Sequence, residues 1–216
     1  MSAFPSPNSG ERRGGVTPSL VVIHYTAISC AEARARLCDP VAEVSAHWLI
    51  CETGAVEALV DERHRAWHAG AGRWAGLDDI NSHSIGIELA NDGQQPFAEP
   101  QMTTLETLLQ AIMARWTILP HRVIGHSDMA PARKSDPGPH FDWRRLALQG
   151  LSVWPEQDDP TTPLASSLAR FGYPDAPPDI RLTAFRLRFR PWARGPEDAT
   201  DRALAADLAR RYAAEI

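Results

Sequence analysis

Two histidines and one aspartate have residue types and positions suited to holding a catalytic metal ion. His24 and His126 each lie near the end of a short apolar segment, and Asp136 follows His126 in a proline-containing loop. Ligand sites of open α/β sheets gather beyond the carboxyl ends of strands. Two His and one Asp leave a fourth position open for water, which is typical of catalytic zinc sites. A lone histidine in an apolar strand is more often a buried core residue, so spacing alone leaves both interpretations open.

A glutamate and a lysine near this set could supply acid–base and electrostatic steps. In the segment SIGIEL, Glu88 alternates with Gly86 and Ala90, so it should lie on a strand face whose small residues leave room for water or substrate. A carboxylate beside a metal can act as general base. Lys134, the only lysine beside 21 arginines, precedes Asp136 by two residues and could stabilise an oxyanion. A solvated Glu and a solvated loop Lys are the alternatives.

Four further residues are predicted to bind substrate. The segment RAWHAG places an aromatic ring and an imidazole in a Gly-rich loop, which suits either a groove wall or a packed loop anchor. The pair His47–Trp48 alternates along a strand, so one of the two faces the core. The predicted substrate-binding set is His47, Trp67, His68 and Asn81.

Apolar patterning predicts the elements that must position these residues. Short β-branched runs predict strands at 19–27, 84–91 and 121–126, and a Gly-containing turn predicts a hairpin within 44–60. Helical spacing predicts helices near 30–38, 100–116 and 141–148, with Ser29 as a possible N-cap. The alternation predicts an α/β fold with a central mixed sheet flanked by helices. Residues 61–83 are predicted to form a surface loop.

The ends of the chain differ in composition from its centre. Residues 1–17 are polar and rich in Gly, Pro and Ser, which predicts an irregular arm before a catalytic domain at 18–155. A Pro- and Asp-rich linker at 156–163 precedes three segments with helical periodicity, which predict a small helical domain at 164–216.

Composition excludes several classes of function. The chain has 216 residues and a net charge of −5, which argues against nucleic-acid binding. It has no apolar run long enough to span a membrane and no apolar leader segment. Its three cysteines, Cys30, Cys38 and Cys51, lack CxxC spacing and are expected to be unpaired thiols in a reducing compartment. We therefore expect a cytoplasmic protein, and the cell envelope is the alternative if a leader segment precedes this sequence.

Five ordered blocks carry a resemblance to a known family. The segments VVIHYTA, VSAHWLI, RAWHAG, NSHSIGIEL and GHSDMAPARKSDPGP together resemble the zinc-dependent N-acetylmuramoyl-L-alanine amidases of the amidase 2 family, over about residues 5–155. The resemblance implies Zn²⁺ ligands at His24, His126 and Asp136, with catalytic roles for Glu88 and Lys134. The C-terminal segments resemble a three-helix peptidoglycan-binding module, and a helical cap that only packs on the catalytic domain is the alternative.

The resemblance also implies a reaction and its partners. It predicts hydrolysis of the amide between N-acetylmuramic acid, or its 1,6-anhydro form, and the L-alanine of peptidoglycan stem peptides, in wall turnover or recycling. Peptidoglycan fragments or the sacculus are the expected partners of a monomer. A non-catalytic peptidoglycan recognition module is the alternative from another class, and a zinc peptidase acting on stem peptides is a third possibility.

Overall fold

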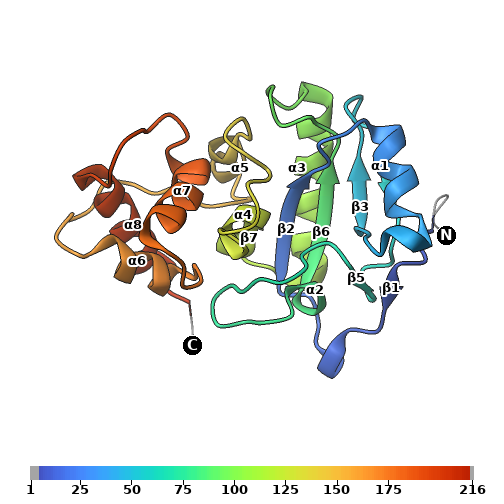
Figure 1. Ribbon diagram of the computed structural model, residues 1–216, viewed down its shortest axis with the longest axis horizontal. Coiled ribbons are helices and arrows are strands. Elements are labelled where there is room, and N and C mark those ends of the chain that lie inside the picture. The colour runs from blue at the N-terminus through green and yellow to red at the C-terminus, as the bar shows by residue number, and fades with distance from the viewer. Residues whose placement is uncertain (1–4, 215–216) are drawn as a thin grey trace.

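The computed structural model describes residues 5–214 and places a mixed five-stranded sheet at the centre of the catalytic part (Figure 1). In spatial order the strands are β4 (Val56–Ala58), β3 (Trp48–Ile50), β6 (Ser84–Leu89), β2 (Leu20–Tyr25) and β7 (Val123–Gly125). β2 is parallel to both β6 and β7, β3 is parallel to β6, and β4 pairs antiparallel with β3. The predicted α/β fold with a mixed sheet and one hairpin is confirmed.

The strand β2, which lies between β6 and β7, is buried on both faces, which explains its continuous apolar run. Val21 and Ile23 pack into a cluster with α3 (Glu99–Trp116) and α5 (Trp143–Leu148). Leu20 and Val22, on the opposite face, belong to a second cluster. His24 has the same parity as Leu20 and Val22, so it shares that second face.

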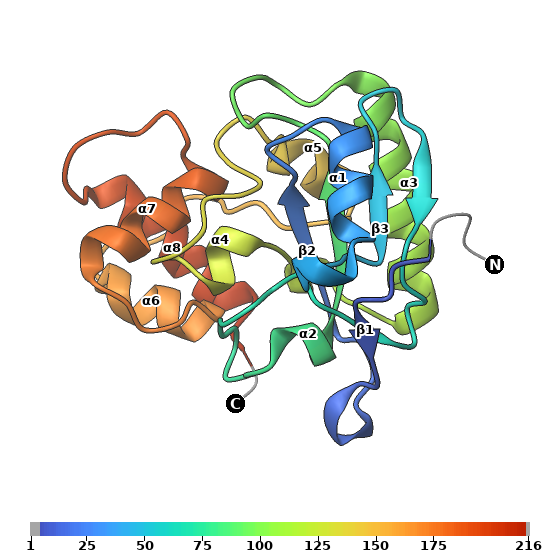
Figure 2. The ribbon, with the colours of Figure 1, turned by 45° about the vertical axis from the view of Figure 1, so that its right-hand side comes forward.

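Helix α1 (Cys30–Leu37) covers β3 on the side of the sheet opposite to α3 (Figure 2). Leu49 of β3 packs with α1, whereas Ile50 packs with α3. The helix begins as predicted, because the Ser29 side chain accepts from the Glu32 backbone N–H and the Glu32 carboxylate accepts from the Ser29 N–H. This capping box fixes where the chain leaves the loop after β2.

The described part of the predicted N-terminal arm is packed into the fold. β1 (Ser9–Gly10) pairs antiparallel with β5 (Arg65–Ala66), inside the predicted surface loop, which also contains the short helix α2 (Ile80–His83). The Arg12 guanidinium is buried and donates to the carbonyls of Glu62, Ser82 and Ser84. The prediction of an irregular arm did not include this packing, in which backbone carbonyls give the buried Arg12 its partners inside the protein. Residues 1–4 lie outside the described part.

Three C-terminal helices lie beyond the β7 edge: α6 (Leu164–Phe171), α7 (Pro178–Phe189) and α8 (Ala199–Arg211) (Figure 1). Their aromatic residues Phe171, Phe185 and Phe189 join the cluster that contains Leu20 and Val22 of β2. The helices therefore share a hydrophobic core with one face of the sheet. Residues 215 and 216 of the predicted third helical segment lie outside the described part.

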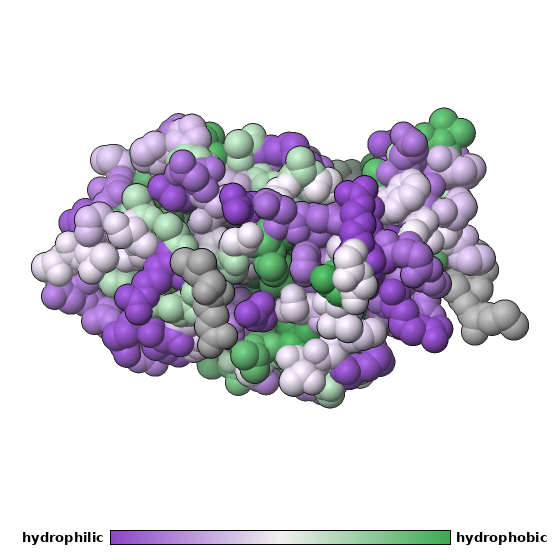
Figure 3. Space-filling view, turned by 90° about the horizontal axis from the view of Figure 1, so that it is seen from below, coloured by the Kyte–Doolittle hydropathy of each residue, from purple (hydrophilic) through white to green (hydrophobic). Residues whose placement is uncertain are grey.

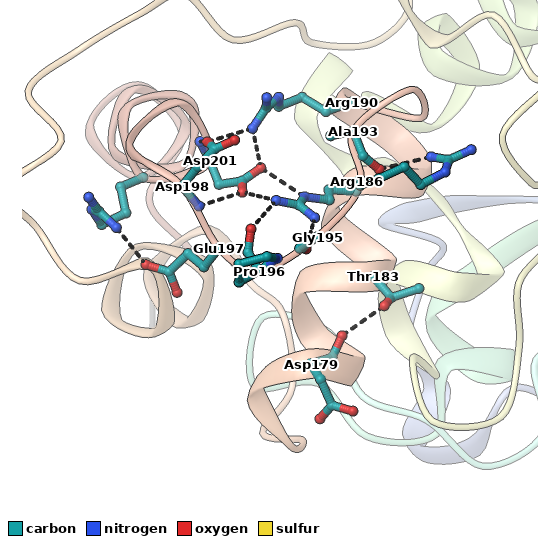
Figure 4. A network of polar contacts seen from close by, with 12 residues as sticks. Asp179, Thr183, Arg186, Arg190, Ala193, Gly195, Pro196, Glu197, Asp198 and Asp201 are labelled. Carbon is teal, nitrogen blue, oxygen red and sulfur yellow. Dashed lines mark hydrogen bonds and ion pairs between the residues drawn. The ribbon is translucent and has the colours of Figure 1, made fainter.

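A polar network closes the connection between α7 and α8 (Figure 4). Arg186 Nε donates to Asp201 Oδ1 at 3.1 Å, and its Nη1 and Nη2 donate to the carbonyls of Gly195 and Pro196. Arg190 Nη1 adds bonds to Asp198 and Asp201. These arginine side chains thus order a loop, residues 190–198, in which no residue is buried.

The face seen in Figure 3 is mostly hydrophilic, with smaller hydrophobic areas near its middle. Among residues 5–214, no helix has the length and apolarity needed to cross a bilayer.

A disulfide links Cys30, the first residue of α1, to Cys51, which follows β3. Their Cα atoms are 5.2 Å apart, within the range for a disulfide. The expectation of three unpaired thiols is therefore wrong. The packing of α1 against β3 brings Cys30 and Cys51 together. The number of cysteines alone does not show which residues the fold places side by side.

Thiol titration tests this pairing. Denatured protein without reductant should show one reactive thiol, that of Cys38, and three after reduction, because Cys30 and Cys51 are joined. Cys30→Ser is the control and should show two thiols without reductant. Three thiols in unreduced wild type would contradict the disulfide.

Candidate metal centre and active site

The sheet brings the three predicted ligands together at the carboxyl ends of two neighbouring parallel strands. His24 lies near the end of β2, His126 begins α4 (His126–Met129) directly after β7, and Asp136 lies in the following loop. His24 Nδ1 is 2.9 Å from His126 Nδ1, and each nitrogen is 3.0 Å from Asp136 Oδ2. All three residues are buried, so they are held by the fold.

The hydrogen bond made by the far side of the His126 ring supports a metal at this point. Its Nε2 lies 3.0 Å from the Ala69 carbonyl oxygen, which can only accept, so Nε2 carries the proton. In the neutral imidazole that binds metals, Nδ1 then directs a lone pair toward Asp136 Oδ2. A lone pair and a carboxylate oxygen in contact repel each other unless a cation lies between them. Two neutral imidazoles and one carboxylate therefore fit a metal ion as ligands.

His24 is oriented in the same way by a chain of hydrogen bonds through His68. The Ser84 hydroxyl donates to the Ile80 carbonyl at 2.6 Å, so its oxygen accepts from His68 Nε2 at 3.1 Å. His68 Nδ1 is then an acceptor for His24 Nε2–H at 3.0 Å, which leaves His24 Nδ1 to bind the metal. Such partners fix the tautomer and the ring orientation of metal ligands.

The glycine beside Glu88 makes room for this histidine rather than for substrate. A Cβ at Gly86 would lie 2.4 Å from the His68 ring. The expectation that the small residues around Glu88 leave space for water or substrate is therefore wrong at this position. A side chain at Gly86 would displace the ring that orients His24.

The electrostatics of the site favour ligand-competent protonation states. Burial lowers the pKa of His24 to about 4, with a further contribution from His126. Burial lowers the pKa of His68 well below its usual value. Burial alone would raise the pKa of the Asp136 carboxyl, but the adjacent His126 and His24 rings hold it below its ordinary range. At neutral pH these groups are therefore neutral imidazoles and a carboxylate.

Glu88 lies directly beside the ligand set. It is the register partner of His24 in the parallel β2–β6 pair, so the two side chains share one face of the sheet. Its Oε2 is shielded from solvent and, among the described residues, has no hydrogen-bond partner. Burial, followed by the charge of Asp136, raises the pKa of Glu88 to about 8, while Lys134 acts in the opposite direction. A carboxylate with an unused oxygen in this position can exchange a proton with a group bound in the cavity.

One cavity of about 410 Å³ joins the ligand set to both predicted catalytic residues. Lys134 lies on an exposed turn, in which its backbone N–H donates to Ala130 O at 3.0 Å. Trp67 also lines the cavity, as predicted for a groove wall. Sequence reasoning did not identify other residues of the wall, including Tyr25, Thr26, Ile28, Arg36, Ser45 and Arg133.

Two of the predicted substrate-binding residues do not line this cavity. His47 is fully buried, and its Nδ1 accepts from the Gly86 N–H at 2.9 Å. Asn81 is buried, and its Oδ1 accepts from the backbone N–H of His68 at 3.0 Å. Both residues hold the backbone that presents the site. Their polarity indicated a functional position, but only the tertiary structure shows that their partners are backbone groups.

Comparison with known proteins identifies the family. Residues 14–139 match the family model described as N-acetylmuramoyl-L-alanine amidase. The chain is 37% identical to N-acetylmuramoyl-L-alanine amidase AmiD of Escherichia coli (strain K12), over 89% of this chain and 83% of the relative. It is 34% identical to 1,6-anhydro-N-acetylmuramyl-L-alanine amidase AmpD of Haemophilus influenzae, over 65% of this chain and 86% of that relative.

Solved structures agree over the whole fold, including the C-terminal helices. The complex of E. coli AmiD with anhydro-N-acetylmuramic acid-L-Ala-D-γ-Glu-L-Lys matches with a TM-score of 0.84 and 34% identity, covering 100% of this chain and 94% of that one. AmpDh3 of Pseudomonas aeruginosa in complex with anhydromuramic pentapeptide matches with a TM-score of 0.84 and 30% identity, covering 94% and 95%. The ligand geometry, the cavity and these matches agree, and the chain belongs to the N-acetylmuramoyl-L-alanine amidase family.

Proposed function

We propose that this chain hydrolyses the amide between N-acetylmuramic acid, or its 1,6-anhydro form, and the L-alanine of peptidoglycan stem peptides. The observation that carries the proposal is that Glu88, which has a carboxyl oxygen without a hydrogen-bond partner among the described residues, lines one cavity with a convergent His24–His126–Asp136 set. Relatives with this fold have been solved with anhydromuramyl peptides bound. A non-catalytic recognition module would have no need for a general base beside a metal set, which favours hydrolysis.

His24, His126 and Asp136 would hold Zn²⁺ in this reaction. When bound, Zn²⁺ supplies Lewis acidity toward the scissile carbonyl and lowers the pKa of water. Glu88 takes the proton of the attacking water on its carboxylate and returns it to the leaving amine of L-alanine. The Lys134 ammonium at the cavity wall stabilises negative charge on the oxygen of the tetrahedral species. Trp67 supplies an apolar wall beside the reacting group.

The proposal extends to the compartment and the oligomeric state in which the protein acts. The Cys30–Cys51 disulfide supports action in an oxidising compartment, such as the bacterial envelope, instead of the cytoplasm expected from the cysteine count. The ligand set and both catalytic residues come together within one chain, so the proposed site needs no residue from a second copy, and we propose a monomer as the acting species.

Product analysis tests the reaction. Zinc-loaded protein is incubated with a 1,6-anhydro-muropeptide and, separately, with intact sacculi. The masses of the products are then measured by mass spectrometry. We expect a complete stem peptide with a new L-alanine amine, and a sugar with a free lactyl carboxyl group. Cleavage within the stem peptide would indicate a peptidase, and binding without cleavage would indicate a recognition module.

Glu88→Gln tests the general base. The substitution keeps the shape of the side chain but removes its basicity, so zinc should be retained while kcat falls by about 10²–10⁴-fold. In the wild type, kcat/KM should fall as the pH decreases, because protonated Glu88 cannot accept a proton. The midpoint should lie below the metal-free pKa of about 8, since a bound cation favours the carboxylate. Wild-type turnover in this variant would remove Glu88 from the mechanism.

His126→Ala tests the metal ligands. Loss of one of three protein ligands should abolish zinc retention after gel filtration, as measured by elemental analysis, and with it hydrolysis. His140→Ala, at an exposed position outside the ligand set, is the matched control and should retain zinc. Full zinc content in the His126 variant would show that the ligand assignment is wrong.

Lys134→Arg tests whether a compact charge is needed. The substitution keeps the positive charge but spreads it over a larger planar group. Zinc content and KM should change little, while kcat should decrease about tenfold because oxyanion stabilisation depends on exact donor placement. Lys134→Ala should lose more, and equal kcat in all three proteins would mean that Lys134 takes no part in the reaction.

A further inference from the structure

A buried ionic cluster joins the C-terminal helices to the short helix that carries His126. Arg188 of α7 donates through Nη1 to Asp128 Oδ2 of α4 at 2.7 Å, and their side chains are 1% and 0% exposed. The Arg188 guanidinium also lies over the Trp143 ring, 4.4 Å from its centroid. Figure 1 shows α7 beside α4 and β7. The Arg188–Asp128 ion pair is therefore removed from water. The positions of the two side chains are then set by the protein groups that they contact.

Asp128 links these C-terminal residues to the start of α4. Its Oδ2 accepts from the Gly125 backbone N–H at 2.8 Å, and its Oδ1 accepts from the Tyr173 hydroxyl at 2.5 Å. Arg188 Nη2 donates to the carbonyl of Val123 in β7 at 2.9 Å. Burial raises the pKa of Tyr173 well above its usual value, so its hydroxyl remains a donor. The cluster therefore fixes the backbone on both sides of the strand-to-helix junction.

This junction positions two of the three metal ligands. His126 is the first residue of α4, and the Ser127 N–H donates to the Asp136 carbonyl at 2.9 Å. α4 has four residues, which is too few for a helix to be stable on its own. The orientation of α4 must therefore come from its tertiary contacts.

We propose that Tyr173 and Arg188 are positioning residues for the metal centre, which act through Asp128 to hold His126 and Asp136 in place. The C-terminal helices then complete the catalytic site, in addition to any contact they make with peptidoglycan. This inference rests on the proposed zinc-dependent function. Loss of such outer partners typically reduces metal affinity by about 10–100-fold.

Tyr173→Phe tests the inference, because it removes one hydroxyl and keeps the packed ring. Arg188→Leu would leave Asp128 charged and buried without its cation, and that variant could fail to fold for this reason alone. Zinc affinity of Tyr173→Phe is measured by competition with a chromophoric chelator, after thermal unfolding has shown that the protein is folded. We expect affinity about tenfold or more below that of the wild type. In Co²⁺-substituted protein, the visible absorption bands should also shift, which a purely structural loss would not cause.

Tyr212→Phe is the matched control. It removes a hydroxyl that bonds to Arg211 at the end of α8 and takes no part in the hydrogen bonds of Asp128, so zinc affinity and the cobalt spectrum should remain those of the wild type. Equal affinity and spectra in the wild type and Tyr173→Phe would overturn this inference alone. Wild-type protein that retains no zinc would overturn the proposed function and this inference together.

Discussion

The parallel pairing of β2 with both β6 and β7 is the constraint on which the site depends. It places the carboxyl ends of three strands at one edge of the sheet, where His24, Glu88 and His126 meet although they are far apart in the sequence. Because His24 and Glu88 are register partners, a ligand and a proton acceptor lie side by side without any loop having to be ordered. A one-residue shift of β2 in this pairing would turn the His24 side chain to the opposite face, where the apolar core packs against α3, and would separate it from Glu88.

Behind the metal ligands, the hydrogen bonds all donate away from the metal site, from the outer ring nitrogens of His126 and His24 toward backbone carbonyls. Backbone carbonyls at Ala69 and Ile80 are the final acceptors of the two chains that start at His126 and His24. Carbonyls cannot donate, so the protons on the outer ring nitrogens are fixed and both Nδ1 atoms face Asp136. Gly86 contributes by having no side chain, which leaves the space that the His68 ring fills.

Helices on two sides of the sheet stabilise the strand ends that carry the metal ligands. α1 is joined by the Cys30–Cys51 disulfide to the end of β3, and the C-terminal helices share a core with β2 and hold α4 through Asp128. A helical segment of this size has little core of its own, so sharing one with the sheet provides the apolar burial that it needs. The matches to AmiD and AmpDh3 over nearly the whole chain agree with a fold in which this segment is an integral part.

The sequence by itself determined the main strands and helices, the family and the candidate ligands. Apolar periodicity depends on local geometry, so it located β2, β6, α3 and the C-terminal helices, and the spacing of five motifs identified the ligand candidates and the family. Only the tertiary structure decided which of the candidate site residues face the cavity. Trp67 and Lys134 do, whereas His47 and Asn81 bond to backbone groups. The Cys30–Cys51 pairing, the burial of Arg12 and the contact of Arg188 with Asp128 also could not be predicted. Each joins segments that are distant in the sequence, and a polar side chain carries no local signal of which distant partner will desolvate it.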